Sequence, residues 1–320
     1  MIHQIIPIIH EYAFIDVKNL VSICSVNKDS RDIIYRCDNV NFYLLKEIRI
    51  YLENDCLWQD DDIDIIKHFM LLGININDIR ILPDHNELKA LCSASRGGEL
   101  NMIEYLITLG INIVDDYDIF ICSIIEASLY GQLKTIKYFV KKKIITLKDI
   151  RSNDNEALRW ASNNGHLHII KYFVKLGLTI EDVRSNNNEA LQWACKGGWF
   201  DTIKYLIEHF NLTIEDIRSN NNESVQYACE KGYLHIVEYL VSFGLDANDI
   251  RSDDNWALAS SSQNGHLNTV KYIVENFHFN VEDIRSRDNY AIYSARENGY
   301  DDVVVYLLNS IIKNQQMNLI

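Results

Sequence analysis

Proline is nearly absent from this chain, with two in 320 residues, and no Pro-rich or Gly/Ser-rich stretch marks a flexible linker. No apolar run approaches the ~20 residues that a transmembrane helix requires. The first residues also lack the basic segment and small-residue cleavage site of a signal peptide. The seven cysteines are scattered, with no Cys-x-x-Cys pair and no zinc-ligand spacing. These absences predict a soluble intracellular protein with no membrane partner, in the cytoplasm or the nucleus.

Positive charge is also scarce. The chain has 31 Lys and Arg against 45 Asp and Glu, a formal net charge of −14 at pH 7. Because binding to phosphates needs a basic surface, this balance argues against a nucleic-acid partner. No nucleophile–base grouping, phosphate-binding loop or paired-carboxylate spacing is found. We therefore expect no catalytic residue, no metal site and no cofactor.

What the chain does contain is a repeat. The tetrapeptide Asp-(Ile/Val)-Arg-Ser recurs at steps of 33 or 34 residues and ends on Ser152, Ser185, Ser219, Ser252 and Ser286. A glycine follows each serine at a fixed distance, at Gly165, Gly198, Gly232, Gly265 and Gly299. Self-similarity at this period predicts a solenoid, in which each unit buries its apolar face only against its neighbours.

Each unit has the pattern of two short helices. In residues 155–185 a first apolar stripe begins at Ala157 and ends before Gly165. A second stripe covers residues 167–174, and Gly177 is expected to close that helix with a positive φ. The remaining residues predict an extended connection. Helices this short are marginal alone, so stacking between units must stabilise them.

Two motifs of each unit are similar to those of a known family. Gly165-His166-Leu167 and Gly265-His266-Leu267, each followed by an apolar helix, match one motif, whereas a Thr-Pro-Leu-His motif is eroded to Glu156-Ala-Leu-Arg and its equivalents. The pattern resembles the ankyrin repeat. That resemblance implies an all-α solenoid of helix-turn-helix units with loop or hairpin connections. The Asn-rich loops look most like ankyrin proteins of giant DNA viruses, which implies a location in the host cytoplasm.

Asparagine and aspartate recur just before the first helix. The residue directly ahead of it is expected to cap the free N–H groups and is Asn155, Asn188, Asn222, Asn255 or Asn289. The residue before that is expected to take a left-handed conformation at the loop tip and is Asp154, Asn187, Asn221, Asp254 or Asp288.

The register predicts about eight units in residues 45–310, followed by a polar tail at 311–320. Their approximate bounds are 45–79, 86–118, 119–152, 153–185, 186–219, 220–252, 253–286 and 287–310. One residue inserted at Phe210-Asn211 and at Phe277-His278 explains the longer steps.

Residues 1–44 do not fit this register and have two interpretations. The order of residues from Leu20 to Ile34 resembles the second half of an F-box, a small helical module that docks substrate receptors onto cullin-type ubiquitin ligases. The resemblance implies docking through Ile6, Pro7, Ile9, Leu20 and Val26. The alternative is a helical cap that covers the exposed end of the solenoid.

Several side chains that suggest chemistry also recur in register. Arg151, Arg184, Arg218, Arg251 and Arg285 either bind an acidic partner or pair with aspartates, one of which stands two residues before each. His166, His235 and His266 occupy repeat positions that do not converge as zinc ligands must. Cys195 and Cys229 share one position and predict small-residue packing.

Three aromatic residues form the strongest candidate site. Trp160, Trp193 and Tyr227 share one first-helix position in consecutive units, where they either make a binding hot spot or add to the core. The variable positions of the family add Ser185, Asn186, Lys196, Asn220, Glu230 and Lys231.

Together, these features predict a monomeric, non-enzymatic scaffold that binds a partner protein on the concave face of the ankyrin repeats. The alternative is a substrate receptor of a cullin-type ubiquitin ligase, with a ligase adaptor as a further partner.

Overall fold

A computed structural model of the chain describes residues 86–108 and 117–317. The predicted N-terminal module (1–44), its docking residues and the predicted unit at 45–79 lie outside the described residues. The described part divides between Ile145 and Thr146 into two compact bodies, which we call the N-terminal and the C-terminal body.

Every regular element in the described residues is a helix, which confirms the predicted all-α repeat architecture. The N-terminal body contains α7 (Asn86–Gly97), α8 (Leu100–Thr108), α9 (Tyr117–Leu129) and α10 (Leu133–Lys141). The first helices of the C-terminal body are α12 (Ser152–Asn163), α14 (Ile180–Gly197), α17 (Ser219–Glu230), α20 (Ser252–Gln263) and α23 (Ser286–Glu297). Its second helices are α13 (Leu167–Leu176), α15 (Phe200–Phe210), α18 (Leu234–Val241), α21 (Leu267–Asn276) and α24 (Asp301–Met317). Single-turn helices in its connections are α11 (Leu147–Ile150), α16 (Ile214–Ile217), α19 (Ala247–Ile250) and α22 (Val281–Ile284).

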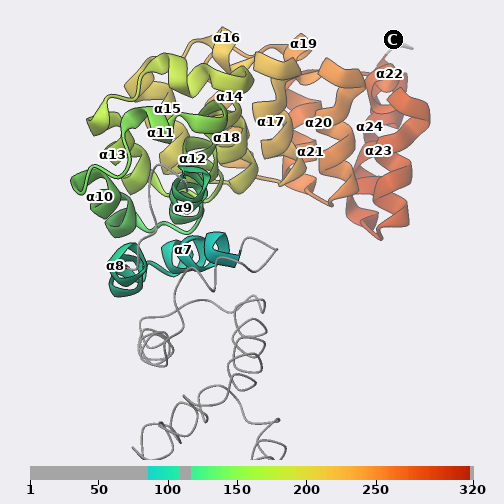
Figure 1. Cartoon of the computed structure of the whole chain (residues 1–320). Helices are drawn as coiled ribbons and strands as arrows, with labels where there is room; N and C mark the ends of the chain where they lie inside the picture. The colour runs from blue at the N-terminus through green and yellow to red at the C-terminus, as the bar shows by residue number, and fades with distance from the viewer. Residues whose placement is uncertain (1–85, 109–116, 318–320) are drawn as a thin grey trace, which may run out of the picture. The chain divides into compact units, whose positions relative to one another are not determined.

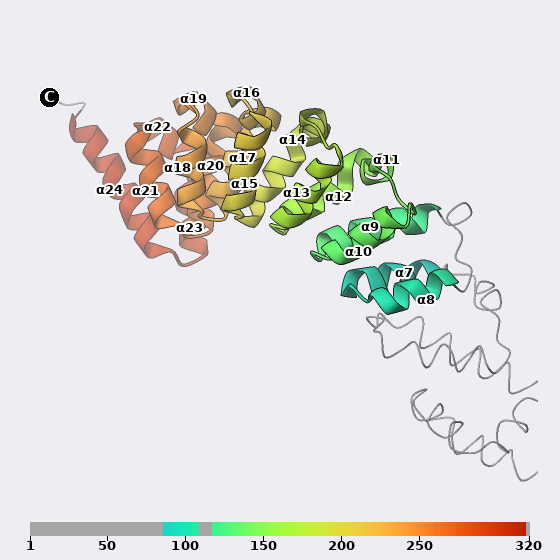
Figure 2. The same cartoon turned by 90° about the vertical axis from the view of Figure 1, so that its left-hand side faces the viewer.

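The first helices of the C-terminal body lie side by side in chain order, each in contact with the next (Figure 1). Each second helix packs on the first helix of its own pair, so the pairs follow one another along the body (Figure 2). The predicted apolar stripes are the buried faces: Leu158, Ile170 and Phe173 are fully buried in the first pair. Burying a side chain of this kind contributes about 1.5–3 kcal/mol, which the isolated pair could not obtain.

Within the bounds of each first helix, three consecutive residues adopt a left-handed backbone, with φ between 49° and 66°, and the regular part of the helix begins after them. The triplets are residues 153–155, 186–188, 220–222, 253–255 and 287–289, and all members except Arg287 are Asn or Asp. Asn and Asp tolerate this conformation best among residues with a Cβ. The predicted left-handed loop tip is therefore confirmed, but the turn uses three residues where the sequence analysis assigned one.

The predicted asparagine caps are wrong. Asn155, Asn188, Asn222 and Asn255 are buried, and their Oδ1 atoms accept no hydrogen bond within the described part of the chain. A capping residue needs an extended backbone, whereas these residues have φ of 60–66° as the last members of the left-handed turn. Their shared role is conformational, and Asn255 Nδ2 in addition donates to the Asp283 carbonyl at 3.3 Å.

The predicted extended connection is instead a single helical turn held by a capping box. At α16, the Asp216 carboxylate accepts hydrogen bonds from the Thr213 backbone N–H at 2.8 Å and the Thr213 Oγ1 at 3.0 Å. The same box forms at Thr146 and Asp149, Thr179 and Asp182, Asp246 and Asp249, and Asn280 and Asp283. Each connection therefore carries an aspartate in a fixed position.

The ends of the second helices follow the predicted backbone logic. Gly177 closes α13 with φ 109°, and Asn211 and His278 take φ of 51° and 50° where an inserted residue replaces the glycine. The last second helix differs, because α24 continues to Met317 through residues 311–317, which the sequence analysis placed in a tail.

A side chain of the next unit covers the junction glycine that follows a first helix. A Cβ on Gly165 would lie 2.3 Å from the Trp199 ring, whose Nε1 donates to the Asn163 carbonyl at 2.7 Å. The same arrangement joins Gly98 with Gln132, Gly198 with Tyr233, Gly232 with His266 and Gly265 with Tyr300. Glycine is needed at these junctions both for its positive φ and for the close approach of the next unit.

Two of these glycines allow the two requirements to be separated. Gly265 and Gly299 have φ of 72° and 78°, but a Cβ would lie 2.3 Å from Tyr300 at Gly265 and would meet nothing within 4 Å at Gly299. We expect Gly265→Ala to lower the free energy of unfolding by about 1–3 kcal/mol more than Gly299→Ala, as overpacking does. Urea denaturation of both variants measures the difference, and equal losses would contradict the packing role.

Candidate partner-binding surface

The arginine series forms ion pairs between consecutive units. Arg184 Nε and Nη2 donate to the two carboxylate oxygens of Asp216 at 2.7 and 2.8 Å. The same two-pronged contact joins Arg151 with Asp182, Arg218 with Asp249 and Arg251 with Asp283. The structural interpretation is confirmed for these four arginines, whereas Arg285 of the last unit is exposed. In each pair the partner aspartate belongs to the next unit and is not the one two residues earlier. These guanidinium groups are therefore committed to the stack.

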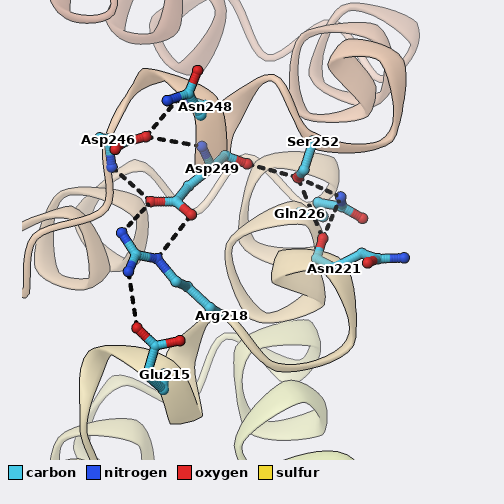
Figure 3. A network of polar contacts seen from close by, with 8 residues as sticks. All are labelled: Glu215, Arg218, Asn221, Gln226, Asp246, Asn248, Asp249 and Ser252. Atoms are coloured by element: carbon cyan, nitrogen blue, oxygen red, sulfur yellow. Dashed lines mark hydrogen bonds and ion pairs between the residues drawn. The ribbon is translucent and has the colours of Figure 1, made fainter.

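Figure 3 shows how the pair of Arg218 and Asp249 is joined to the capping box. The Asp249 carboxylate accepts from Arg218 at 2.9 and 3.0 Å and also from the Asp246 backbone N–H at 2.8 Å. Arg218 Nη1 donates further to Glu215 at 3.0 Å, and Ser252 Oγ donates to the Asp249 carbonyl at 2.6 Å. One carboxylate thus holds a turn in its own unit and the arginine of the preceding unit.

The environment favours the ionised form of three of these carboxyls, those of Asp182, Asp216 and Asp283. Burial by itself would raise the pKa of Asp182, Asp216 and Asp283, but hydrogen bonds from the paired arginine and from the capping residue outweigh it, so each pKa lies below its usual value. The hydrogen bond with Asp283 in turn raises the pKa of Arg251.

These shifts predict acid-sensitive stacking. The unfolded-state pKa of Asp is about 3.9. Because the folded-state pKa is lower, the pairs stabilise the fold above that value and lose their contribution as pH falls through the folded-state pKa. We expect the free energy of unfolding to decrease below about pH 4. Asp283→Asn should lower the free energy of unfolding at pH 7. It should also make that free energy depend less steeply on pH in the acid range. Asp288→Asn, at an exposed loop tip, is the control. If the free energy of unfolding fell equally with pH in the parent and in Asp283→Asn, the acid sensitivity would not come from this ion pair.

The three predicted aromatic residues lie half-buried on α12, α14 and α17. The rings of Trp160 and Trp193 meet edge to face, with centroids 4.9 Å apart. Trp160 Nε1 donates to Glu156 at 3.2 Å, and the Arg159 guanidinium lies over the Trp193 ring, 5.4 Å from its centroid. The rings therefore pack against one another while part of each remains open to solvent.

Acidic side chains set the electrostatics around these rings. Burial raises the pKa of the Tyr227 phenol, and the negative charges of Glu223, Glu230 and Glu189 raise it further. Lys196 Nζ lies 5.1 Å from the centroid of the Tyr227 ring. The rings already attract the protein's own cations, so their surroundings favour positively charged groups.

Ser185 is a structural residue. It is half-buried, and its Oγ donates to the Asp182 carbonyl at 2.8 Å and to the Asp154 carbonyl of the preceding turn at 3.2 Å. Ser252 makes the equivalent bonds to Asp249 and Asn221. Ser185 and Ser252 therefore tie successive turns together.

The other predicted loop and helix-end residues are more accessible. Asn186 and Asn220 are exposed at the turns, where their amides donate to Glu189 and Glu223, respectively. Lys196 is exposed over Tyr227. Lys231 is exposed and pairs with the half-buried Glu230 at 2.9 Å.

The sequence analysis missed two members of the aromatic surface. In the last two units Trp256 and Tyr290 stand where the earlier units carry Glu156, Glu189 and Glu223, and both are half-buried. The positions equivalent to Trp160 hold the buried residues Ser260 and Ser294. A shift of four residues is one helical turn along the same face. We call Trp160, Trp193, Tyr227, Trp256 and Tyr290 the aromatic track; the sequence analysis stopped at Tyr227 because it followed a single register position.

Cys195, Cys229 and His266 have structural roles. Cys195 and Cys229 are fully buried, and burial raises the pKa of both thiols, that of Cys229 to about 12. His266 Nε2 lies 3.0 Å from the Glu230 carbonyl of the preceding unit. No group of three His, Cys, Asp or Glu within residues 86–108 and 117–317 is arranged to hold a metal ion. The same ranges contain no helix that is long and apolar enough to span a membrane.

Comparison with protein families agrees with this architecture. A family described as "Ankyrin repeats (3 copies)" matches residues 158–251 and 225–318, which together make up half of the chain. The chain belongs to the ankyrin-repeat family, whose repeats are generally protein–protein interaction modules and whose members are typically non-enzymatic. A search of curated proteins found no match.

The half-burial of the aromatic track predicts its energetic role. We expect Trp193→Ala to lower the free energy of unfolding by about 1–2 kcal/mol, because the edge-to-face contact is lost while part of the ring is already solvated. Phe173→Ala, at a fully buried position, should cost about 3–5 kcal/mol. Urea denaturation compares the two, and a loss at Trp193 as large as that at Phe173 would assign the ring to the core.

Proposed function

We propose that this chain is a non-enzymatic scaffold that binds a partner protein on its helix-one face, the solvent side of α12, α14, α17, α20 and α23. The observation that carries the proposal is the aromatic track, which places one half-buried ring on each of five consecutive first helices. Trp and Tyr are the residues most enriched at binding hot spots.

The helix-one face is also favoured because other repeated residues are used in stacking, whereas the aromatic track remains accessible. Four of the arginines, the loop serines Ser185 and Ser252, and the covered junction glycines are occupied by contacts within the stack. The track keeps exposed aromatic surface on a scaffold held rigid by those contacts, and rigid sites lose little entropy on binding. Its acidic surroundings favour a partner segment that carries Lys or Arg.

Capture from cells tests the proposal. Full-length chain and the variants Trp193→Ala and Tyr227→Ala are used as bait, with Tyr130→Ala, an exposed aromatic outside the track, as the control. We expect at least a tenfold loss of affinity for a recovered partner in the track variants, equivalent to about 1.4 kcal/mol, and no loss in the control. Unchanged binding by both track variants would exclude the helix-one face.

A more specific form of this proposal is a substrate receptor of a cullin-type ubiquitin ligase. It rests on the F-box-like residue order from Leu20 to Ile34. Recovery of a cullin-ligase adaptor that disappears when residues 1–44 are deleted would support it, and an unchanged set of partners after the deletion would contradict it. An origin in a giant DNA virus and an intracellular location belong to the same proposal and rest on the residue pattern alone.

A further inference from the structure

Helix α24 carries an exposed apolar stripe. Val305, Leu308 and Ile312 are 56%, 39% and 52% exposed, and their spacing places them on one face of the helix. Together with Tyr293 at 61%, they make up most of the large apolar side chains exposed in the described residues. Apolar surface concentrated in this way marks an interaction site more often than scattered exposure does.

Val305 departs from the pattern of its own repeat. The equivalent position of the other second helices is always charged, at Lys137, Lys171, Lys204, Glu238 and Lys271. The four that precede Lys271 are exposed to solvent. The valine therefore replaces a charge on an outward-facing site, which the stacking of units does not require.

The last unit does not offer the surface that a further ankyrin unit would need. Three residues before the junction glycine, the other described units have a small buried residue: Ser95, Ser128, Ser162, Cys195, Cys229 or Ser262. The last unit has Arg296, which is exposed and cannot occupy the space that Ser or Cys fills. In addition, α24 continues as a helix through the residues that would form the next connection.

The charges at the two ends of α24 are complementary to those of a second, antiparallel copy of the same helix. Asp301 and Asp302 stand at its start, Lys313 lies near its end, and the apolar stripe lies between them. When two such helices pack antiparallel, the stripes meet in the middle and each acidic start lies near the lysine of the other helix. A two-fold contact requires this kind of self-complementary surface. We propose that two copies of this chain associate through α24 in this antiparallel arrangement.

The size of the stripe sets the expected strength. A stable interface buries roughly 800 Å² per partner. Three partly exposed side chains with their flanking charges would bury a smaller area. The association should therefore be weak, with a dissociation constant in about the micromolar to millimolar range. The monomer predicted from the sequence is then the form at low concentration. Since α24 is not part of the helix-one face, this proposal does not depend on the proposed function.

Sedimentation equilibrium of the full chain tests the association between about 5 and about 500 µM, which covers the expected range. We expect the average mass to rise from 37.2 kDa toward twice that value. Val305→Lys restores the charge that other units carry, so it should preserve the circular dichroism spectrum while weakening association at least about tenfold. Tyr130→Lys, at an exposed aromatic outside α24, should have no effect.

A charge swap tests the antiparallel arrangement. Lys313→Glu and the double variant Asp301→Lys with Asp302→Lys should each associate more weakly than the parent, whereas an equimolar mixture of the two should associate again because the opposite charges face each other. A constant mass of one chain over the whole range would overturn the proposal. Association that Val305→Lys leaves unchanged would also overturn it, because the contact would then lie elsewhere.

Discussion

The stack of helix pairs depends on one carboxylate in each connection. Asp182, Asp216, Asp249 and Asp283 each accept hydrogen bonds from the capping residue of their own turn and from the arginine of the preceding unit. The first contact fixes the direction of the connecting turn, and the second fixes that turn against its neighbour. Because one carboxylate serves both purposes, with its Oδ2 atom accepting from the capping residue and from the arginine, local structure and stacking are coupled at every step along the C-terminal body.

This arrangement decides which side of the molecule is available for binding. The left-handed triplet begins two residues after the arginine, and the regular part of the first helix that follows it buries its small apolar face in the stack. The other side of that helix is only partly covered, by contacts such as the one between Trp160 and Trp193, and it carries the aromatic track. Repeated residues stabilise the stack. The aromatic residues shift by one helical turn between Tyr227 and Trp256, so the surface of the last two units differs from that of the three before them.

Much of this fold could be predicted from the sequence, because its periodicity reports local requirements. The helix pairs, their apolar faces and the positive φ at Gly177 follow from residue type and spacing. The asparagine before each helix misled the analysis, since Asn favours both capping and left-handed backbone and only the geometry separates the two. The partner of each arginine was also missed: an aspartate two residues away and one 31 or 32 residues away are both in register. Neither the exposed apolar stripe of α24 nor the four-residue shift in the aromatic track repeats, so periodicity carried no signal for them.

A double-mutant cycle on Arg251 and Asp283 measures the coupling between units most directly. This pair is well enclosed, with the guanidinium also lying over the Phe279 ring at 4.7 Å. The cycle uses Arg251→Met, Asp283→Asn and their combination, with the exposed pair Lys204 and Glu208 as the control. We expect a coupling free energy of about 1 kcal/mol or more for Arg251 and Asp283, and close to zero for the control. Additive losses at Arg251 and Asp283 would contradict the view that these carboxylates join each unit to the next.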